Sequence, residues 1–184
     1  MTMIDRDSLF NEQHFKNIYL KMLDYLSKND MAEQRLVDRI NRLKIRYPAS
    51  KRYELYTKVN AWKIIPLLRE DGYTDEERFA ARVFDSLKDK KDGLHMIRRK
   101  MLYRQINPKV VEQIVNIFVN SEHRQDLSKI THAAKEKYRN LQKKFDQDPV
   151  KKHQIKSKLY AWLAMRGFDS HEATRIITSV AKNE

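Results

Sequence analysis

The sequence contains no cysteine, which excludes disulfide bridges, zinc–thiolate sites and thiol nucleophiles and fits a reducing cytoplasm. It contains only three glycines, Gly72, Gly93 and Gly167, and these lie far apart. A nucleotide-binding loop needs several glycines close together, so that backbone amides can approach phosphate. Walker loops and dinucleotide-binding turns are therefore excluded, and we expect no nucleotide cofactor.

Long apolar runs are also missing from the sequence. No stretch approaches the roughly 20 apolar residues that a membrane span needs. The first seven residues lack the apolar core of a signal peptide, so we expect no leader and no membrane contact. Four prolines and three glycines in 184 residues predict long helices joined by few turns.

Apolar residues recur at helical spacing along the whole chain. One face of a helix is indicated by Phe15, Ile18, Tyr19, Met22, Leu23 and Leu26. No segment alternates apolar and polar residues for long enough to predict a strand, so we expect an all-α fold. The spacing predicts helices near 12–28, 31–44, 50–71, 75–90, 94–105, 108–120, 125–146, 150–166 and 170–182, with a kink or break at Pro66 in the third.

Several helix starts carry capping signals. An acceptor residue precedes a glutamate by three positions in the pairs Asp30–Glu33, Thr74–Glu77 and Asp169–Glu172. Each pair can form a capping box, in which two backbone donors without helical partners are satisfied reciprocally. Asn107 followed by Pro108 predicts a further start, with an acceptor at the cap and proline in the first turn.

A short pattern recurs at three helix junctions. It consists of an apolar helix, a turn residue, a large apolar residue and an N-cap, and it occurs at 72–74, 105–107 and 167–169. Glycine in the first and third junctions can end a helix in a left-handed conformation, while the apolar residue pins the turn into the core. The recurrence predicts three tandem three-helix modules, 1–73 with an N-terminal extension, 74–121 and 122–184.

Positive charge dominates, with 38 Lys and Arg against 25 Asp and Glu, a formal net charge of +13. Such a chain is attracted to polyanions. A solvated basic surface is the simpler interpretation, and contact with DNA phosphate or an acidic protein surface is the functional one. Our candidate residues for partner or DNA contact are Arg42, Lys44, Arg46, Arg98, Arg99, Arg104, Lys151, Lys152, Lys158 and Arg166.

Catalytic motifs are missing. The six histidines include no HExxH or similar helical pair, and the two nearest, His123 and His132, are nine residues apart. There is no GxSxG elbow for a serine nucleophile. The acidic run 75–77 falls in a predicted first helical turn, where capping and dipole pairing explain it better than a metal. We expect no enzymatic activity, no metal and no cofactor.

Three segments together resemble the RecX family. Residues 72–80, Gly-Tyr-Thr-Asp-Glu-Glu-Arg-Phe-Ala, are similar to its Gly-(Tyr/Leu)-x-Asp-(Asp/Glu)-x-Arg-Phe-Ala signature. Residues 158–169 resemble its C-terminal block ending in Arg-Gly-Phe, and 93–102 its Gly-x-x-x-Ile-x-x-x-Leu segment. The sequence departs from the family in having Gln105 where a glycine is expected and Met165 in place of the first Arg of Arg-Arg-Gly.

The resemblance implies an elongated, curved array of the three modules and a cytoplasmic protein that binds the RecA recombinase filament. It also implies modulation, most often inhibition, of RecA's ATPase, strand-exchange and co-protease activities, and thus a role in homologous recombination, DNA repair and the SOS response. We expect a monomer that can also touch single- or double-stranded DNA. The alternative is a stand-alone DNA-binding protein with helix-turn-helix-like modules.

Overall fold

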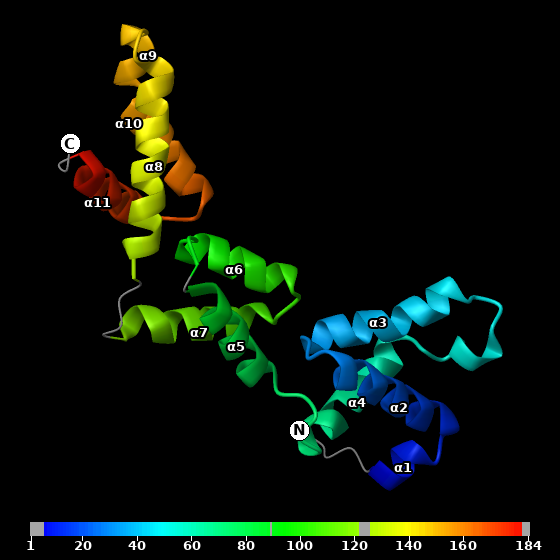
Figure 1. Ribbon diagram of the computed structural model, residues 1–184. Coiled ribbons are helices and arrows are strands. Elements are labelled where there is room, and N and C mark those ends of the chain that lie inside the picture. The colour runs from blue at the N-terminus through cyan, green and yellow to red at the C-terminus, as the bar shows by residue number, and fades with distance from the viewer. Residues whose placement is uncertain (1–5, 89, 122–125, 182–184) are drawn as a thin grey trace. The chain divides into compact units, whose positions relative to one another are not determined.

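The computed structural model describes residues 6–88, 90–121 and 126–181, and within them the secondary structure is helical without a strand (Figure 1). This confirms the all-α prediction. The elements are α1 (Arg6–Phe10), α2 (Gln13–Lys28), α3 (Glu33–Arg46), the 3-10 turn η1 (Lys51–Tyr53), α4 (Lys58–Glu70), α5 (Glu76–Lys88), α6 (Leu94–Tyr103), α7 (Pro108–Asn120), α8 (Ser128–Phe145), α9 (Pro149–His153), α10 (Ile155–Met165) and α11 (Ser170–Ala181).

Two compact units make up the chain. Unit 1 comprises Met1–Ala81 and Leu102–Val111, and unit 2 comprises Arg82–Met101 and Glu112–Glu184. Residues assigned from the sequence to a middle module, 74–121, are therefore shared between the two units. The division into three modules and the curved array stay predictions.

The core of unit 1 is formed by the apolar faces of α2, α3 and α4, which pack against one another (Figure 1). Helix α2 contributes Phe15, Ile18 and Met22, as its i, i+3, i+7 spacing predicts. Each of these side chains is almost completely buried, and burying one contributes about 1.5–3 kcal/mol. From α3 and α4 the core receives Leu36, Val37, Ile40, Ala61, Ile64, Ile65 and Leu68.

The third predicted helix, 50–71, is wrong in its first half. The structure has the short turn η1 there, and α4 begins only at Lys58. Thr57 is extended, and its hydroxyl accepts a hydrogen bond from the Asn60 amide at 3.1 Å, which caps the shorter helix. The helix does not break at Pro66, since α4 runs through it, and a kink there stays a prediction. Buried apolar side chains on both sides of Pro66 outweigh the roughly 3 kcal/mol that an interior proline costs.

Two of the predicted capping boxes are wrong. Helix α3 begins after Ala32 with no side-chain cap, so Asp30 does not cap it. At α5 the cap is Asp75 rather than Thr74, because its Oδ1 accepts the Arg78 amide at 2.8 Å. The box at α11 is confirmed by reciprocal hydrogen bonds between Asp169 and Glu172.

At the start of α7 the Asn107–Pro108 prediction is confirmed. Asn107 Oδ1 accepts the Lys109 amide at 2.9 Å, and the helix begins at Pro108.

The three junctions predicted from the recurring pattern all turn through the left-handed region. Gly72 has φ 74°, Gln105 φ 63° and Gly167 φ 83°. Phe168 and Ile106 are buried behind their turns, as expected. Tyr73 is 53% exposed, which corrects the expectation that it pins the first junction.

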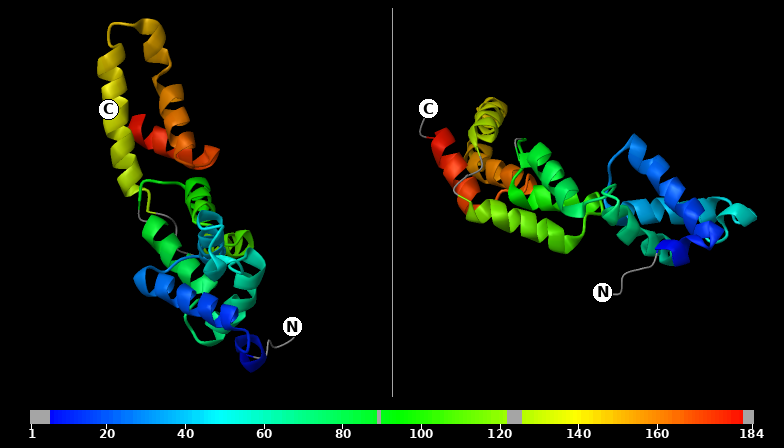
Figure 2. Two further views of the ribbon diagram at one scale, coloured as in Figure 1. Left: turned by 90° about the vertical axis from the view of Figure 1, so that its right-hand side faces the viewer. Right: turned by 90° about the horizontal axis from the view of Figure 1, so that it is seen from below.

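Unit 2 contains a three-helix packing of α8, α10 and α11, which stay side by side in both views of Figure 2. Its core is formed by Ile130, Ala134, Leu159, Leu163, Phe168, Ala173, Ile176 and Val180. The predicted helix 150–166 is two helices, α9 and α10, separated at Gln154. Asp148 caps the first of them by accepting the Lys151 amide at 3.0 Å.

Candidate partner and nucleic-acid surfaces

The first predicted basic group lies at the C-terminal end of α3. Arg42, Lys44 and Arg46 are all exposed. Arg42 and Arg46 are four residues apart and share a face, whereas Lys44 projects from another side. Cations at this end of a helix are favoured by the helix dipole. The guanidinium of Arg46 also lies 5.6 Å from the ring centre of Tyr47.

The second predicted group is not one surface. Arg98 Nε donates to Glu112 Oε2 at 3.2 Å, so this half-buried side chain helps to hold α6 against α7. Arg99 is exposed on α6. Arg104 is half-buried and belongs to unit 1, whereas Arg98 and Arg99 belong to unit 2. Of the three, only Arg99 is an exposed side chain of unit 2.

The third predicted group is partly neutralised by neighbours. Lys151 Nζ lies 2.8 Å from Asp148 Oδ2, and Lys152 Nζ lies 3.3 Å from Asp146 Oδ1. Lys158 Nζ lies 5.6 Å from the ring centre of Phe145. All three lysines are exposed, and exposed pairs of this kind contribute little to stability. They remain accessible to a partner.

Arg166 supports the fold of unit 2. Its guanidinium carbon lies 4.6 Å from the ring centre of Trp162, and its Nη1 donates to the Lys91 carbonyl at 3.3 Å. Its carbonyl accepts the Gly93 amide at 2.8 Å. This residue was chosen as a partner contact from the sequence, but the structure gives it internal contacts.

A basic groove between α8 and α11 was missed by sequence reasoning. We call it the α8–α11 groove. Its volume is about 500 Å³, and it is lined by Leu127, Ser128, Thr131, His132, Lys135, Arg175, Ile176 and Ser179. The polar residues of α8 follow i, i+3, i+4, i+7 spacing, a signal available in the sequence. These residues and Arg175 line the same groove only because α11 packs on α8.

A larger hollow of about 780 Å³ lies within unit 1, beside the start of α5. The buried carboxylate of Glu33 accepts hydrogen bonds from Nε (2.6 Å) and Nη2 of Arg69, and this pairing raises the pKa of Arg69. The Glu76 carboxylate accepts the amides of Glu33 at 2.8 Å and Asn107 at 2.9 Å. Glu33 and Glu76 therefore join α3, α4, α5 and the residue before α7.

No metal-binding arrangement is found in the described parts of the chain, where no three His, Asp or Glu side chains converge suitably. None of the described helices combines the length and apolar character needed to cross a membrane. The fold and surfaces define an all-α protein with exposed basic side chains in both units.

Comparison with known proteins finds a curated relative and solved structures that are similar to this chain. No family model matches the chain. A curated relative, Regulatory protein RecX of Chlorobium phaeobacteroides (strain BS1), is 26% identical over 122 residues, which are 66% of this chain and 72% of that protein.

The fold matches the crystal structure of RecX from Lactobacillus salivarius with a TM-score of 0.65 and 15% identity, over 92% of this chain and 97% of that one. A second crystal structure, of a regulatory protein RecX, matches with a TM-score of 0.64 and 18% identity, over 100% of this chain and 81% of that one. The chain is thus related to RecX proteins, and the resemblance predicted from its sequence is confirmed.

Proposed function

We propose that the protein is a non-enzymatic, monomeric regulator that binds the DNA-bound filament of a RecA recombinase in the cytoplasm. The observation that carries the proposal is the similarity to RecX proteins, in sequence over 66% of the chain and in fold over 92% or more. Binding lowers RecA's ATP hydrolysis, strand exchange and co-protease activity. The protein thereby restrains homologous recombination and tunes DNA repair and the SOS response.

The charge of the chain supports a polyanionic partner. The net charge of +13 attracts the protein to a filament that encloses DNA. Exposed cations such as Arg42 and Arg46 share one face of α3, which supports their proposed contact with phosphate or an acidic RecA surface. Each phosphate contact adds salt sensitivity to the binding.

The experiment that tests this function measures the ATPase of RecA on single-stranded DNA while the protein is added. We expect the rate to fall as the protein approaches stoichiometric amounts. The variant Arg42→Ala/Arg46→Ala should inhibit less than Lys16→Ala/Lys109→Ala, which removes the same charge from exposed positions on α2 and α7. An unchanged ATPase at stoichiometric excess would remove the proposal.

A stand-alone DNA-binding protein is the second candidate, favoured by the cationic α8–α11 groove. The two functions differ in one observation. A stand-alone binder shifts a DNA duplex strongly without RecA at physiological salt, and its affinity falls steeply as salt rises. A filament regulator exerts its main effect only when RecA is present.

A further inference from the structure

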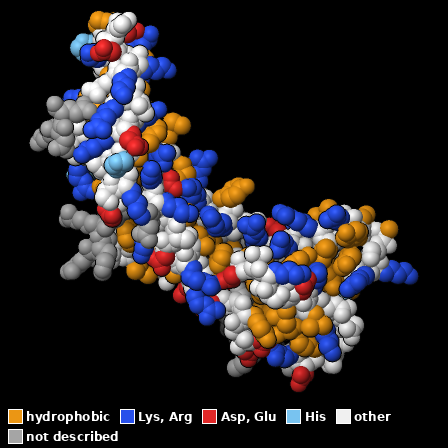
Figure 3. Space-filling view, viewed as in Figure 1, with side chains coloured by type: hydrophobic (Ala, Val, Ile, Leu, Met, Phe, Trp, Pro, Cys, Tyr) orange, Lys and Arg blue, Asp and Glu red, His pale blue; other side chains and the backbone are white. Residues whose placement is uncertain are grey.

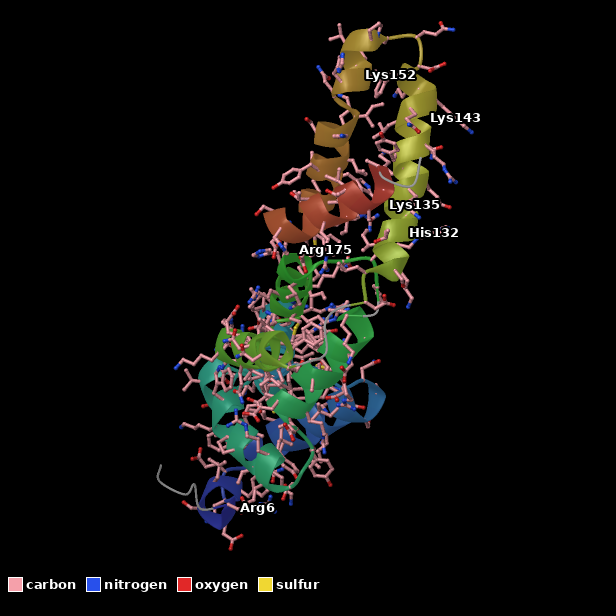
Figure 4. The ribbon with its side chains drawn as sticks, turned by 90° about the vertical axis from the view of Figure 1, so that its left-hand side faces the viewer. Arg6, His132, Lys135, Lys143, Lys152 and Arg175 are labelled. Atoms are coloured by element: carbon pink, nitrogen blue, oxygen red, sulfur yellow. The ribbon has the colours of Figure 1, made fainter. Side chains whose placement is uncertain are left out.

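The α8–α11 groove has the composition of an anion site. None of its lining residues is acidic, and hydroxyl groups from both helices accompany its cations. Figure 4 shows His132 and Lys135 on α8 and Arg175 on α11, in the part of unit 2 where these two helices meet. A positively charged hollow of this kind favours a negatively charged ligand.

Two cations of the groove are available to a ligand. Lys135 and Arg175 form no ion pair or side-chain hydrogen bond with any of the residues that the structure describes. Two acidic residues of this region have other partners: Asp126 accepts the Ser128 hydroxyl at 2.8 Å, and Glu136 Oε1 lies 3.9 Å from His132 Nδ1. Elsewhere in unit 2, Lys151 and Lys152 face carboxylates at 2.8 and 3.3 Å.

The basic character continues along α8 away from the groove. Lys135, Arg139 and Lys143 follow at four-residue spacing and so share one side of the helix. Lys143 then lines a second hollow of about 450 Å³ together with Gln142, Asp146 and Lys152, and in it Asp146 pairs with Lys152 and leaves Lys143 as the further cation. Figure 3 shows Lys and Arg side chains following α8, and Figure 4 shows His132, Lys135 and Lys143 in order along it.

The length of this row suits a repeating polyanion. Lys143 lies eleven positions after His132, which corresponds to about 16 Å of helix at 1.5 Å per residue. A DNA strand carries one phosphate about every 3.4 Å along a duplex axis, so roughly five phosphates span this distance. A single phosphorylated side chain or a free phosphate would occupy the groove alone and leave the rest of the row without a ligand.

We propose that the α8–α11 groove binds the phosphodiester backbone of DNA, with Lys135 and Arg175 contacting phosphate and the strand continuing along α8 toward Lys143. No Phe, Tyr or Trp lines the groove, so base stacking is not available there. Contacts to phosphate alone carry no sequence information. The groove therefore binds DNA of any sequence, in single or double strands.

This inference rests on the DNA contact that the proposed function includes, but it does not need RecA. It assigns that contact to residues outside the groups chosen from the sequence. If the groove binds DNA and the RecA ATPase stays unchanged, the proposed function is wrong but the assignment of DNA binding to the groove is supported. If the ATPase falls and the groove variants bind DNA normally, only the groove assignment fails.

The test measures fluorescence anisotropy of labelled single- and double-stranded oligonucleotides of two unrelated sequences, without RecA, from low to moderate salt. We expect Lys135→Ala/Arg175→Ala to weaken binding roughly tenfold or more at low salt. The slope of log affinity against log salt should fall by about two. The charge-conserving Lys135→Arg/Arg175→Lys variant should keep most of the affinity.

Lys16→Ala/Lys109→Ala is the matched control, because it removes two exposed cations from unit 1. Its affinity should change by less than about threefold. Thermal unfolding followed by circular dichroism confirms that every variant is folded. The inference is overturned if both charge-removing variants lose the same DNA affinity, or if Lys135→Ala/Arg175→Ala loses none. It is also overturned if the protein binds a polyglutamate peptide in preference to DNA.

Discussion

Gly93 and Gly167 meet backbone to backbone in unit 2. A Cβ atom on Gly93 would overlap the carbonyl group of Gly167, and one on Gly167 would overlap the backbone nitrogen of Met96. Hydrogen bonds fix the contact, because the Gly93 amide donates to the Arg166 carbonyl at 2.8 Å and the His95 amide to the Gly167 carbonyl at 3.2 Å. The start of α6 is thereby held directly on the turn between α10 and α11.

This contact predicts different costs for the same substitution at two glycines. Gly167 and Gly72 both have positive φ, but a Cβ atom on Gly72 meets nothing within 4 Å. Gly72→Ala should lower the free energy of unfolding by about 1–2 kcal/mol, the cost of the left-handed conformation. Gly167→Ala adds overpacking of about 1–3 kcal/mol against backbone that cannot move aside cheaply. Urea denaturation of both variants measures the difference, and equal losses would contradict the close contact.

The buried carboxylate of Glu33 predicts an asymmetric double-mutant cycle. Arg69→Met removes its ion-pair partner and leaves the charge buried, which should destabilise unit 1 by about 3 kcal/mol. This lies at the low end for buried pairs, because the Arg69 side chain is itself half exposed. Adding Glu33→Gln to Arg69→Met should recover part of the loss. Chemical denaturation of the two single variants and the double variant tests this, and strictly additive losses would argue against the pairing.

The fold should lose stability in acid partly through Asp24. Lys21 first, and then Lys28, lower the pKa of this carboxyl from 3.8 to about 2 by hydrogen bonding to it. Because the folded pKa lies below the unfolded one, the contribution to stability is full above pH 3.8 and is lost as pH falls toward 2.

The variant Asp24→Asn isolates this contribution. It should be less stable than the parent protein at neutral pH, and the gap should close between pH 3.8 and about 2. Thermal unfolding across this pH range provides the measurement. A gap that stays constant throughout would show that the two lysines do not act on Asp24 in this way.

The helices were largely predictable from the sequence because their signals are local. Apolar spacing in residues such as Phe15, Ile18 and Met22 depends only on the helix period. The turn at Gln105 was predicted from its place in a recurring junction, but its left-handed conformation was not, because glutamine rarely adopts it. The cap at Asp30 failed because Glu33 pairs with Arg69, a partner 36 residues away that no local pattern reveals.

The candidate sites were less predictable because they depend on packing between distant segments. Arg166 was chosen as a partner contact from the sequence, which cannot tell that this side chain lies against Trp162. Sequence reasoning also gave no weight to Arg175, which gains its neighbours Lys135 and His132 only through the packing of α11 on α8. Whether a basic residue can bind a partner depends on its exposure and on its contacts within the fold, and the number of cations in a segment reveals neither.

Co-sedimentation with RecA filaments assembled on single-stranded DNA tests the proposed role most directly. The protein should pellet with the filaments in a saturable ratio, and much less with DNA at the same salt when RecA is omitted. Recovery entirely in the supernatant, or equal pelleting with and without RecA, would contradict a function on the filament.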